Sequence, residues 1–179
     1  MILVLVGPSA SGKTTLANLY CKRNKTFHRV VTYTTRPMRP GERDGVDYHF
    51  ITKEEFWRKV RNNEFLEYAQ YRDWYYGTGS DLDPEDDLVA VLTPSGARRM
   101  KKRFPDSTNT AYLAVERRSR LMKMLQRGDN VDEAYRRNLS DEGQFDGFED
   151  EADLVLQNHG YKKSPESLCD KLRNFIEVI

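Results

Sequence analysis

The sequence has little cysteine and no long apolar stretch. Only two cysteines, Cys21 and Cys169, occur among 179 residues, and they show no metal-ligand spacing. This low count argues against a disulfide framework and favours a reduced, cytoplasmic setting. No apolar run approaches the length that spans a bilayer, and the short apolar start lacks the basic flank of a signal peptide.

The sequence also lacks a net charge of either sign. Lysine and arginine together number 29, against 28 aspartates and glutamates. Such a balance provides no global field that would attract nucleic acid or an anionic membrane, so neither partner is expected. With no internal repeat or low-complexity linker, residues 1–179 are expected to form one domain, as a monomer or a homodimer.

The strongest pattern lies in the first fifteen residues. Residues 2–6 are an unbroken apolar run rich in β-branched side chains, which is typical of a strand buried on both faces. The next eight residues fit the phosphate-loop spacing G-x-x-x-x-G-K-[ST] at every required position. They are Gly7, Pro8, Ser9, Ala10, Ser11, Gly12, Lys13 and Thr14.

Each part of this loop suits the binding of an anion. Gly7 and Gly12 allow the backbone to curl so that successive N–H groups face one phosphate, and a helix expected over 13–23 adds its positive dipole end. Lys13 supplies a mobile cation for the β- and γ-phosphates, and the Thr14 hydroxyl can ligate Mg²⁺. A plain glycine-rich turn is the alternative, but such a match rarely falls by chance between a strand and a helix. We therefore predict that the chain binds a nucleoside triphosphate.

Residues 32–50 are rich in hydroxyls, arginines and turn-forming residues, which predicts a shaped loop after a strand at 27–32. Arg36 and Arg39 are close enough in sequence to converge on one anion, and their planar guanidinium groups suit a phosphate. A solvated basic turn explains the same charges equally well.

The next segment predicts a small antiparallel unit. A helix capped at Thr52 precedes two strands at 65–71 and 74–78, which a turn at Arg72 and Asp73 would join. Glu67 is the only carboxylate of its strand and is flanked by apolar residues. It is either an exposed edge residue or a ligand for N–H donors on a base.

The remaining segments alternate between strand and helix. This alternation after a phosphate loop predicts an α/β fold with a doubly wound parallel sheet, interrupted by the antiparallel insert at about 32–80. Strands are expected at 88–92, 110–115 and 154–156, and helices at 94–102, 118–126, 132–144 and from 165 to the C-terminus.

Five ordered motifs make the chain resemble guanylate kinase, a P-loop nucleoside monophosphate (NMP) kinase. Besides the phosphate loop they are residues 34–42, 47–50, 64–67 and 75–78. The resemblance covers nearly the whole chain and implies the three-layer P-loop NTPase fold with ATP:GMP phosphoryl transfer, also to dGMP, assisted by Mg²⁺. It further implies a core at 1–31, 81–125 and 141–179, an NMP-binding insert at about 32–80 and a helical lid at about 126–140.

The resemblance also implies roles for individual residues, with Glu67 accepting hydrogen bonds from guanine N1–H and its amino group and Thr78 serving the O6 side. Thr14 would be the metal ligand. The implied catalytic residues are Lys13, Arg36, Arg127 and Arg137. The implied ATP-binding residues are Gly7, Pro8, Ser9, Ala10, Ser11, Gly12, Lys13, Thr14, Thr15 and Asn158. The implied GMP-binding residues are Thr32, Arg36, Arg39, Tyr48, Glu67, Tyr76, Gly77, Thr78 and Thr93.

Three departures from the family pattern keep alternatives open. Ala10 stands where the family often has glycine, and the link at 80–87 is short and acidic. Val91 and Thr93 occupy the positions of two family aspartates, so a kinase of another nucleoside monophosphate, of another deoxynucleotide or of a phosphorylated sugar remains an alternative. A non-catalytic binding module is disfavoured because the phosphate loop is intact.

Overall fold

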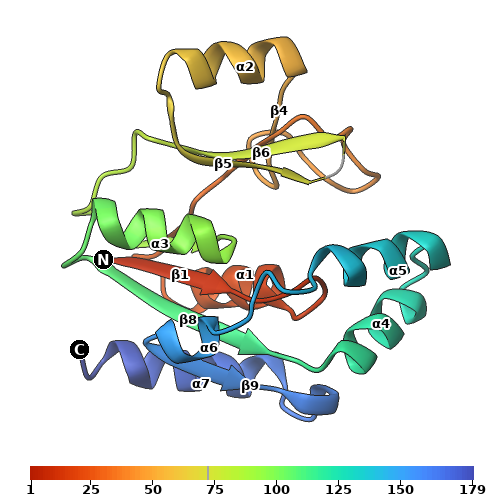
Figure 1. Ribbon diagram of the computed structural model, residues 1–179. Coiled ribbons are helices and arrows are strands. Elements are labelled where there is room, and N and C mark those ends of the chain that lie inside the picture. Colours follow the sequence, from red (N-terminus) through yellow and green to blue (C-terminus); the bar gives the residue numbers. More distant parts are fainter. Residues whose placement is uncertain (72) are drawn as a thin grey trace.

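The computed structural model describes residues 1–71 and 73–179. The predicted turn residue Arg72 lies outside the described residues. A core sheet with its helices forms the lower part of the molecule in Figure 1, and the segment with helix α2 and strands β3 to β6 forms the upper part. Helices α4 (Arg117–Gln126) and α5 (Val131–Ser140) project from one side of the core.

Within the described residues, five strands form the core sheet in the order β2-β7-β1-β8-β9, and every pairing is parallel. The central strand β1 (Ile2–Val6) is completely buried, as its apolar run predicts. The predicted doubly wound parallel sheet is therefore confirmed. The other strands are β2 (His28–Arg29), β7 (Leu88–Val91), β8 (Thr108–Ala114) and β9 (Leu154–Gln157).

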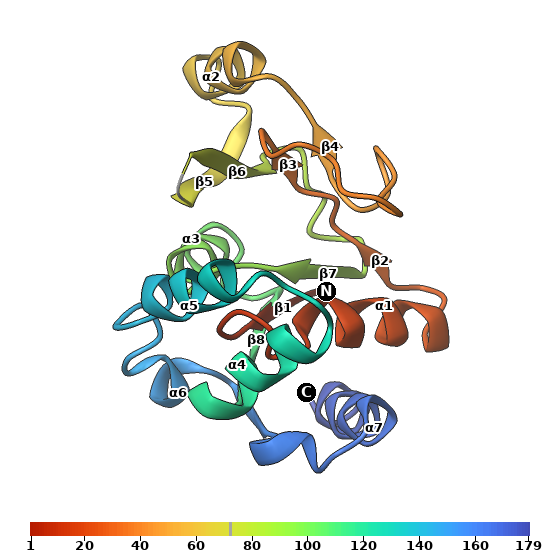
Figure 2. The same ribbon diagram turned by 90° about the vertical axis from the view of Figure 1, so that its right-hand side faces the viewer.

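The two faces of β1 pack against different helices, because successive side chains of a strand point to opposite faces. Leu3 and Leu5 join the apolar side chains of α1 (Lys13–Arg23) and α7 (Pro165–Ile176). On the opposite face, Ile2, Val4 and Val6 pack against side chains of α3 (Pro94–Arg103) and α6 (Phe148–Glu151). Figure 2 shows α3 and α7 on opposite sides of the strands, which gives the three layers.

The insert has a second, smaller sheet in the order β4-β3-β6-β5 in the part of the chain that the structure describes. The antiparallel hairpin of β5 (Phe65–Tyr71) and β6 (Trp74–Gly79) agrees with the prediction. Strand β3 (Tyr33–Thr34) pairs antiparallel with β6 but parallel with β4 (His49–Phe50), so the insert sheet is mixed.

Helix α2 (Lys53–Arg61) lies over the insert sheet (Figure 1). Its aromatic side chains pack against those of the sheet. The Thr52 hydroxyl accepts a hydrogen bond from the Glu55 amide at 3.1 Å, so the predicted cap is confirmed. Phe56 is fully buried, with its ring centroid 4.8 Å from Phe65 and 5.4 Å from Tyr75. The insert thus has an apolar centre of its own.

Two predicted elements differ from the observed ones. The strand expected at 27–32 is reduced to β2, because the chain leaves the core sheet and its next residues pair within the insert. The helix expected at 132–144 ends at Ser140, and residues 141–147 form turns with Gly143 and Gly147 at positive φ. No helix in the described ranges is long and apolar enough to cross a membrane.

Candidate active site

The phosphate loop connects the end of β1 with the start of α1. Gly12 precedes Lys13, the first helical residue, with a left-handed φ of 97°. A Cβ atom at Gly7 would lie 2.8 Å from the Leu113 carbonyl oxygen of the neighbouring strand, so only glycine fits at this close approach. The structure therefore explains why glycine occupies positions 7 and 12 of the predicted loop.

Ala10 also adopts a left-handed conformation, with φ of 63°. This conformation costs an L-residue other than glycine about 1–2 kcal/mol, so surrounding contacts must hold it. One such contact comes from Tyr161 of the short helix η1 (His159–Tyr161), whose hydroxyl donates to the Ala10 carbonyl oxygen at 2.7 Å.

Lys13 is half-buried, and its Nζ donates to the Pro8 carbonyl oxygen at 2.8 Å. Burial lowers the pKa of Lys13 to about 8, with a smaller opposing effect of Asp141 and a further lowering by Arg120. At neutral pH the amine therefore keeps its positive charge beside the loop.

A carboxylate far along the chain also contacts the loop. Asp141, directly after α5, accepts from the Ser9 amide at 2.8 Å through Oδ2 and from the Ser9 hydroxyl at 3.0 Å through Oδ1. Arg120 of α4 donates to the same Oδ2 at 2.8 Å and to the Ser9 carbonyl oxygen at 3.3 Å. The phosphate loop is thus bonded to both helices that project from the core.

Among the cavities that border this loop in the described residues, Ser9 lines three. The first, of about 640 Å³, lies between the loop, α4, α5 and the start of α7, and we call it the loop cavity. It brings together most of the residues predicted for the triphosphate. Among its lining residues are Ser9, Ala10, Ser11, Gly12, Lys13, Thr14, Thr15, Arg127, Arg137 and Asn158.

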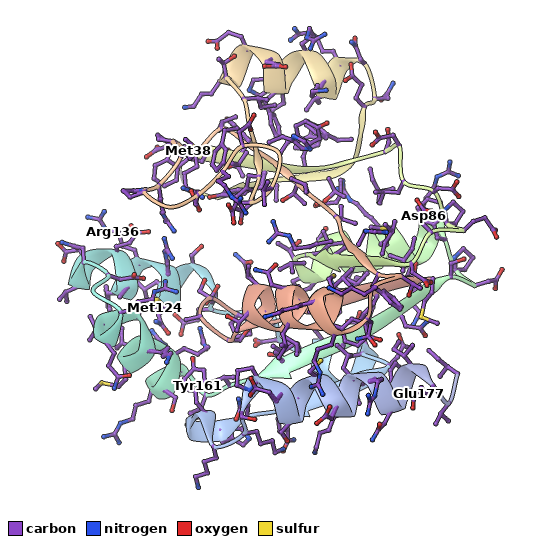
Figure 3. All side chains as sticks on the ribbon, turned by 180° about the vertical axis from the view of Figure 1, so that it is seen from behind. Met38, Asp86, Met124, Arg136, Tyr161 and Glu177 are labelled. Atoms are coloured by element: carbon purple, nitrogen blue, oxygen red, sulfur yellow. The ribbon has the colours of Figure 1, made fainter. Side chains whose placement is uncertain are left out.

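A second cavity, of about 660 Å³, lies between the core and the insert, and we call it the arginine cavity. Figure 3 shows Met38 of the insert and Arg136 of α5 on the same side of the molecule, one above the other. Among the residues that line the arginine cavity are Ser9, Thr14, Arg36, Arg39, Tyr48, Tyr76, Thr93 and Arg137.

The third cavity, of about 200 Å³, extends from the loop towards Glu67, and we call it the glutamate cavity. Predicted acceptor-side residues and loop residues share its wall. Among them are Gly7, Ser9, Lys13, Thr32, Tyr48, Glu67, Tyr76, Gly77, Val91, Thr93, Asp141 and Gln144.

Arg36 is the anchored member of the arginine pair, with 6% of its surface exposed. Its guanidinium donates to Glu42 at 2.7 Å and to the Pro37 carbonyl oxygen at 2.7 Å, and lies 5.4 Å from the Tyr48 ring centroid. Arg39 has its pKa lowered by desolvation and then by the neighbouring charges of Arg36 and Arg137. Positive charge is therefore concentrated here, as binding of a phosphate requires.

Glu67 lies at the opposite end of the acceptor side, with only 8% of its surface exposed. Burial raises its pKa, whereas the Thr78 hydroxyl, which donates to Oε1 at 2.7 Å, stabilises the charged form. Thr78 itself is fully buried and donates its one hydroxyl hydrogen to Glu67, so in this arrangement that hydrogen is not directed at the guanine O6 that the resemblance implies for it. A Cβ at Gly96 would lie 3.2 Å from this carboxylate, so the start of α3 is shaped around it.

Thr93 is the N-cap of α3, since its hydroxyl accepts from the Gly96 amide at 3.1 Å. It also lines both the arginine and the glutamate cavities, whereas Val91 lines the glutamate cavity. Val91 and Thr93, which stand where the family has aspartates, therefore belong to the cavity wall, and both side chains are uncharged.

The two arginines of the segment predicted to be a lid are oriented by acidic neighbours. Arg127 donates to Asp129 through Nε at 2.8 Å, and Arg137 donates to Glu133 through Nε at 2.8 Å. Arg137 lines both the loop cavity and the arginine cavity. Asn158 exchanges two hydrogen bonds with the Lys163 backbone, so its buried amide shapes a turn beside the loop cavity.

Sequence reasoning missed the residues that hold the loop from outside. Arg120, Asp141 and Tyr161 contact loop atoms, and Gln144 lines two cavities. Asp141 stands in a short acidic pair with Glu142, which resembles ordinary surface charge. No local pattern marks a contact that joins residues 132 positions apart.

A parallel sheet with a phosphate loop after its central strand, and arginines on an insert across the cleft, define a P-loop nucleotide kinase. The family model described as guanylate kinase matches residues 1–82. Guanylate kinase of Chlorobium luteolum is 34% identical, over 99% of this chain and 93% of the relative. Guanylate kinase of Hydrogenovibrio crunogenus is 32% identical, over 88% of this chain and 80% of the relative. The chain belongs to the guanylate kinase family.

Solved structures agree on the fold. The crystal structure of guanylate kinase from Anaplasma phagocytophilum superposes with a TM-score of 0.74 at 24% identity, over 99% of this chain and 85% of the other. A sugar kinase from Janibacter superposes with a TM-score of 0.55 at 15% identity, over 99% and 94%. At these identities the likeness concerns the fold alone.

Proposed function

We propose that the chain transfers the γ-phosphoryl group of ATP to GMP or dGMP, giving GDP or dGDP. The observation that carries this proposal is the buried Glu67 carboxylate at one end of a cavity system whose other parts hold the arginine pair and the phosphate loop. A base, an acceptor phosphate and a donor phosphate would each meet groups of complementary chemistry there.

Recognition of guanine is assigned to Glu67. Guanine offers an N1–H and an exocyclic amino group side by side, and one carboxylate accepts both. The Thr78 hydroxyl donates a hydrogen bond to Oε1 at 2.7 Å and so keeps the carboxylate oriented. Adenine presents an acceptor at N1, which would face the carboxylate charge unfavourably.

The acceptor phosphate is assigned to Arg36 and Arg39, with the Tyr48 and Tyr76 hydroxyls beside them in the arginine cavity. Guanidinium groups bind phosphate oxygens in pairs and keep their charge at any relevant pH. Glu42 pairs with the Arg36 guanidinium at 2.7 Å. The positive charge of Arg39 is therefore less compensated by a nearby carboxylate.

The triphosphate is assigned to the loop amides and Lys13, with Thr14 as the protein ligand of Mg²⁺. No group of three His, Cys, Asp or Glu side chains within the described residues could hold a metal ion. This fits Mg²⁺, which keeps most of its water and binds mainly through nucleotide phosphates. When bound, Mg²⁺ neutralises charge on the β- and γ-phosphates.

The chain's own contribution to the reaction is positioning and charge. Lys13 and the lid arginines Arg127 and Arg137 would stabilise the γ-phosphoryl group in the transition state, and Arg36 and Arg39 would align the acceptor phosphate. No general base is needed, because an oxygen of a phosphate monoester is already nucleophilic near neutral pH.

A coupled assay of ADP formation with ATP and six acceptors tests the proposal. GMP and dGMP should be used, and AMP, CMP, UMP and dTMP should be used at least about a hundredfold less efficiently in kcat/KM. A Lys13→Ala preparation controls for contaminating kinases. Preference for another nucleotide, or for a phosphorylated sugar, would replace the acceptor in this proposal. Absence of all transfer despite nucleotide binding would indicate a binding module.

A further inference from the structure

The strongest unexplained feature of the site is the carboxylate that contacts the phosphate loop from the lid side. Asp141 follows α5 directly and lines the glutamate cavity together with Lys13 and Ser9. It accepts both the amide and the hydroxyl hydrogen of Ser9. The Ser9 amide is therefore fixed by the chain itself.

Asp141 is paired and largely removed from solvent. Its side chain and that of Arg120 are each only 8% exposed, and their charged atoms are 2.8 Å apart. Arg120 uses its other donors on the carbonyl oxygens of Val115 at 3.1 Å and Ser9 at 3.3 Å. A buried pair of this kind adds little stability by itself but fixes geometry, and loss of one partner leaves an uncompensated charge.

The loop has a conformation that needs such support. Ala10, next to Ser9, has a left-handed φ of 63°, which glycine would adopt without strain. Contacts on either side hold this backbone, one from Asp141 to the Ser9 amide and one from Tyr161 to the Ala10 carbonyl oxygen. These contacts come from separate elements, which together over-determine the strained turn.

We infer that Asp141 is a positioning residue of the phosphate loop, which fixes the Ser9 amide and hydroxyl where the loop, arginine and glutamate cavities meet. Arg120 orients the carboxylate for this task. Because Asp141 also ends the lid helix, the lid and the phosphate loop are aligned by one side chain. The kinetic part of this inference rests on the proposed phosphoryl transfer, whereas its structural part does not.

The position of Ser9 predicts which kinetic constant responds. Among the described residues, Asp141 is bonded to Ser9 and Arg120, whereas the proposed guanine ligand Glu67 is held by Thr78. A displaced loop would misalign the γ-phosphoryl group with its acceptor, and misplacement of reacting groups by about 1 Å can cost about a hundredfold in rate. Asp141→Asn should therefore lower kcat at least about tenfold and change the KM of ATP and GMP less than about threefold.

A double variant separates positioning from stability. Asp141→Ala alone leaves Arg120 buried and unpaired, so the melting temperature should fall. Arg120→Leu together with Asp141→Ala removes both charges, and the melting temperature should recover, since apolar replacement of a buried pair is often neutral. The kcat value should stay low, because Ser9 still lacks its anchor. Recovery of kcat together with the melting temperature would overturn the inference.

Hydrogen–deuterium exchange gives a readout without any acceptor. The Ser9 amide is protected in the wild-type protein by Asp141, so Asp141→Asn should accelerate exchange in a peptide covering residues 7–12, with strand β1 unchanged. Unchanged exchange of that peptide would contradict the inference whatever the enzyme phosphorylates. Faster exchange in a protein that does not use GMP would support the loop anchor and reject only the proposed acceptor.

The same two segments supply a matched control pair. Arg117 of α4 and Glu142 lie 3.3 Å apart, but their side chains are 50% and 64% exposed and contact solvent. Arg117→Leu with Glu142→Ala should leave kcat and loop exchange as in the wild type. If the control lowered kcat as much as the Asp141 variants do, the effect would come from the general docking of α4 and α5. Asp141 would then have no specific role.

Discussion

The half-buried Lys13 and the buried Glu67 are ionisable side chains that both line the glutamate cavity. Burial lowers the pKa of Lys13 to about 8 and raises the pKa of Glu67, because desolvation penalises each charged form. Their partners only partly offset this penalty. Perturbed groups of this kind concentrate at functional sites, which agrees with their position at the cavity wall.

Lys13→Ala should abolish transfer and leave the fold intact. The Lys13 amine contacts only the Pro8 carbonyl oxygen within the loop, so its loss removes little packing. Loss of one cation at the transferring group should lower kcat by about a hundredfold or more. Circular dichroism and a turnover assay measure both effects, with Lys22→Ala, on the exposed end of α1, as the control. Turnover near the wild-type value would exclude Lys13 from catalysis.

The lowered pKa of Lys13 predicts an alkaline limb in the pH profile. The positive form acts on the phosphates, so kcat/KM for ATP should be constant below the pKa and fall as the pH rises through about 8. Any activity that remains in Lys13→Arg should lack this limb, because arginine stays protonated. A wild-type profile that is flat from pH 7 to pH 10 would contradict the assignment.

At the scale of elements, the start of α3 combines helix capping with the wall of the acceptor site. Thr93 caps the helix, and Gly96 leaves room for the Glu67 carboxylate. An aspartate at position 93 would cap as well as threonine, whereas it would add a charge to the cavity. Stability and catalysis can therefore be changed separately at this position.

Thr93→Asp should change the free energy of unfolding by less than about 1 kcal/mol, within the usual range of capping differences. It should lower the Mg²⁺ concentration needed for half-maximal rate, because the added carboxylate is a hard oxygen ligand near the phosphates. Thr52→Asp is the matched control, since Thr52 caps α2 at the same 3.1 Å distance but lies in the insert. Equal Mg²⁺ dependence in both variants and the wild type would mean that position 93 acts only as a cap.

Elements with strong local signals were predictable. The apolar run of β1, the spacing of the phosphate loop and the caps at Thr52 and Thr93 are set by neighbouring residues, and the structure has all of them. Elements that depend on distant partners were not. Strand β2 ends after two residues because Tyr33 and Thr34 pair with β6 instead.

The residues of the candidate site divide in the same way. The cavities unite side chains that motifs had already indicated, such as Arg36 and Glu67. The early end of α5 and the contact of Asp141 with Ser9 could not be predicted, because they depend on tertiary packing over 132 residues of sequence separation. The resemblance marks Ala10 as a position where the family often has glycine, but the loop pattern permits any residue there, so the pattern alone does not predict its left-handed φ.

At the scale of the whole molecule, the proposed ligands of the two nucleotides lie on three separate parts: the core, the insert and the lid segment. Lys13, Arg36 and Arg137 come from these parts in turn, and the cavities between them are open to solvent. Transfer to an acceptor other than water requires that water be excluded. The insert at about 32–80 and the lid at about 126–140 are therefore expected to close over bound substrates.

Small-angle scattering with and without a bisubstrate analogue measures this closure. The radius of gyration should decrease when the analogue binds, because the insert and α5 approach each other. Arg137→Ala, which removes a side chain shared by the loop and arginine cavities, should show a smaller decrease at the same occupancy. An unchanged radius at full occupancy in the wild type would contradict closure.

The most direct measurement for the whole account is a competition between GMP and AMP for ATP, followed by anion-exchange chromatography of all nucleotides in the wild type and in Glu67→Gln. The wild type should consume GMP and leave AMP almost unchanged, so that each ATP consumed gives one ADP and one GDP. In the variant the amide directs a donor at the guanine donors, so kcat/KM for GMP should fall at least about a hundredfold, with the KM of ATP nearly unchanged. Consumption of AMP by the wild type at a rate comparable to that of GMP, or full use of GMP by Glu67→Gln, would contradict the assignment of this protein as a guanine-specific kinase.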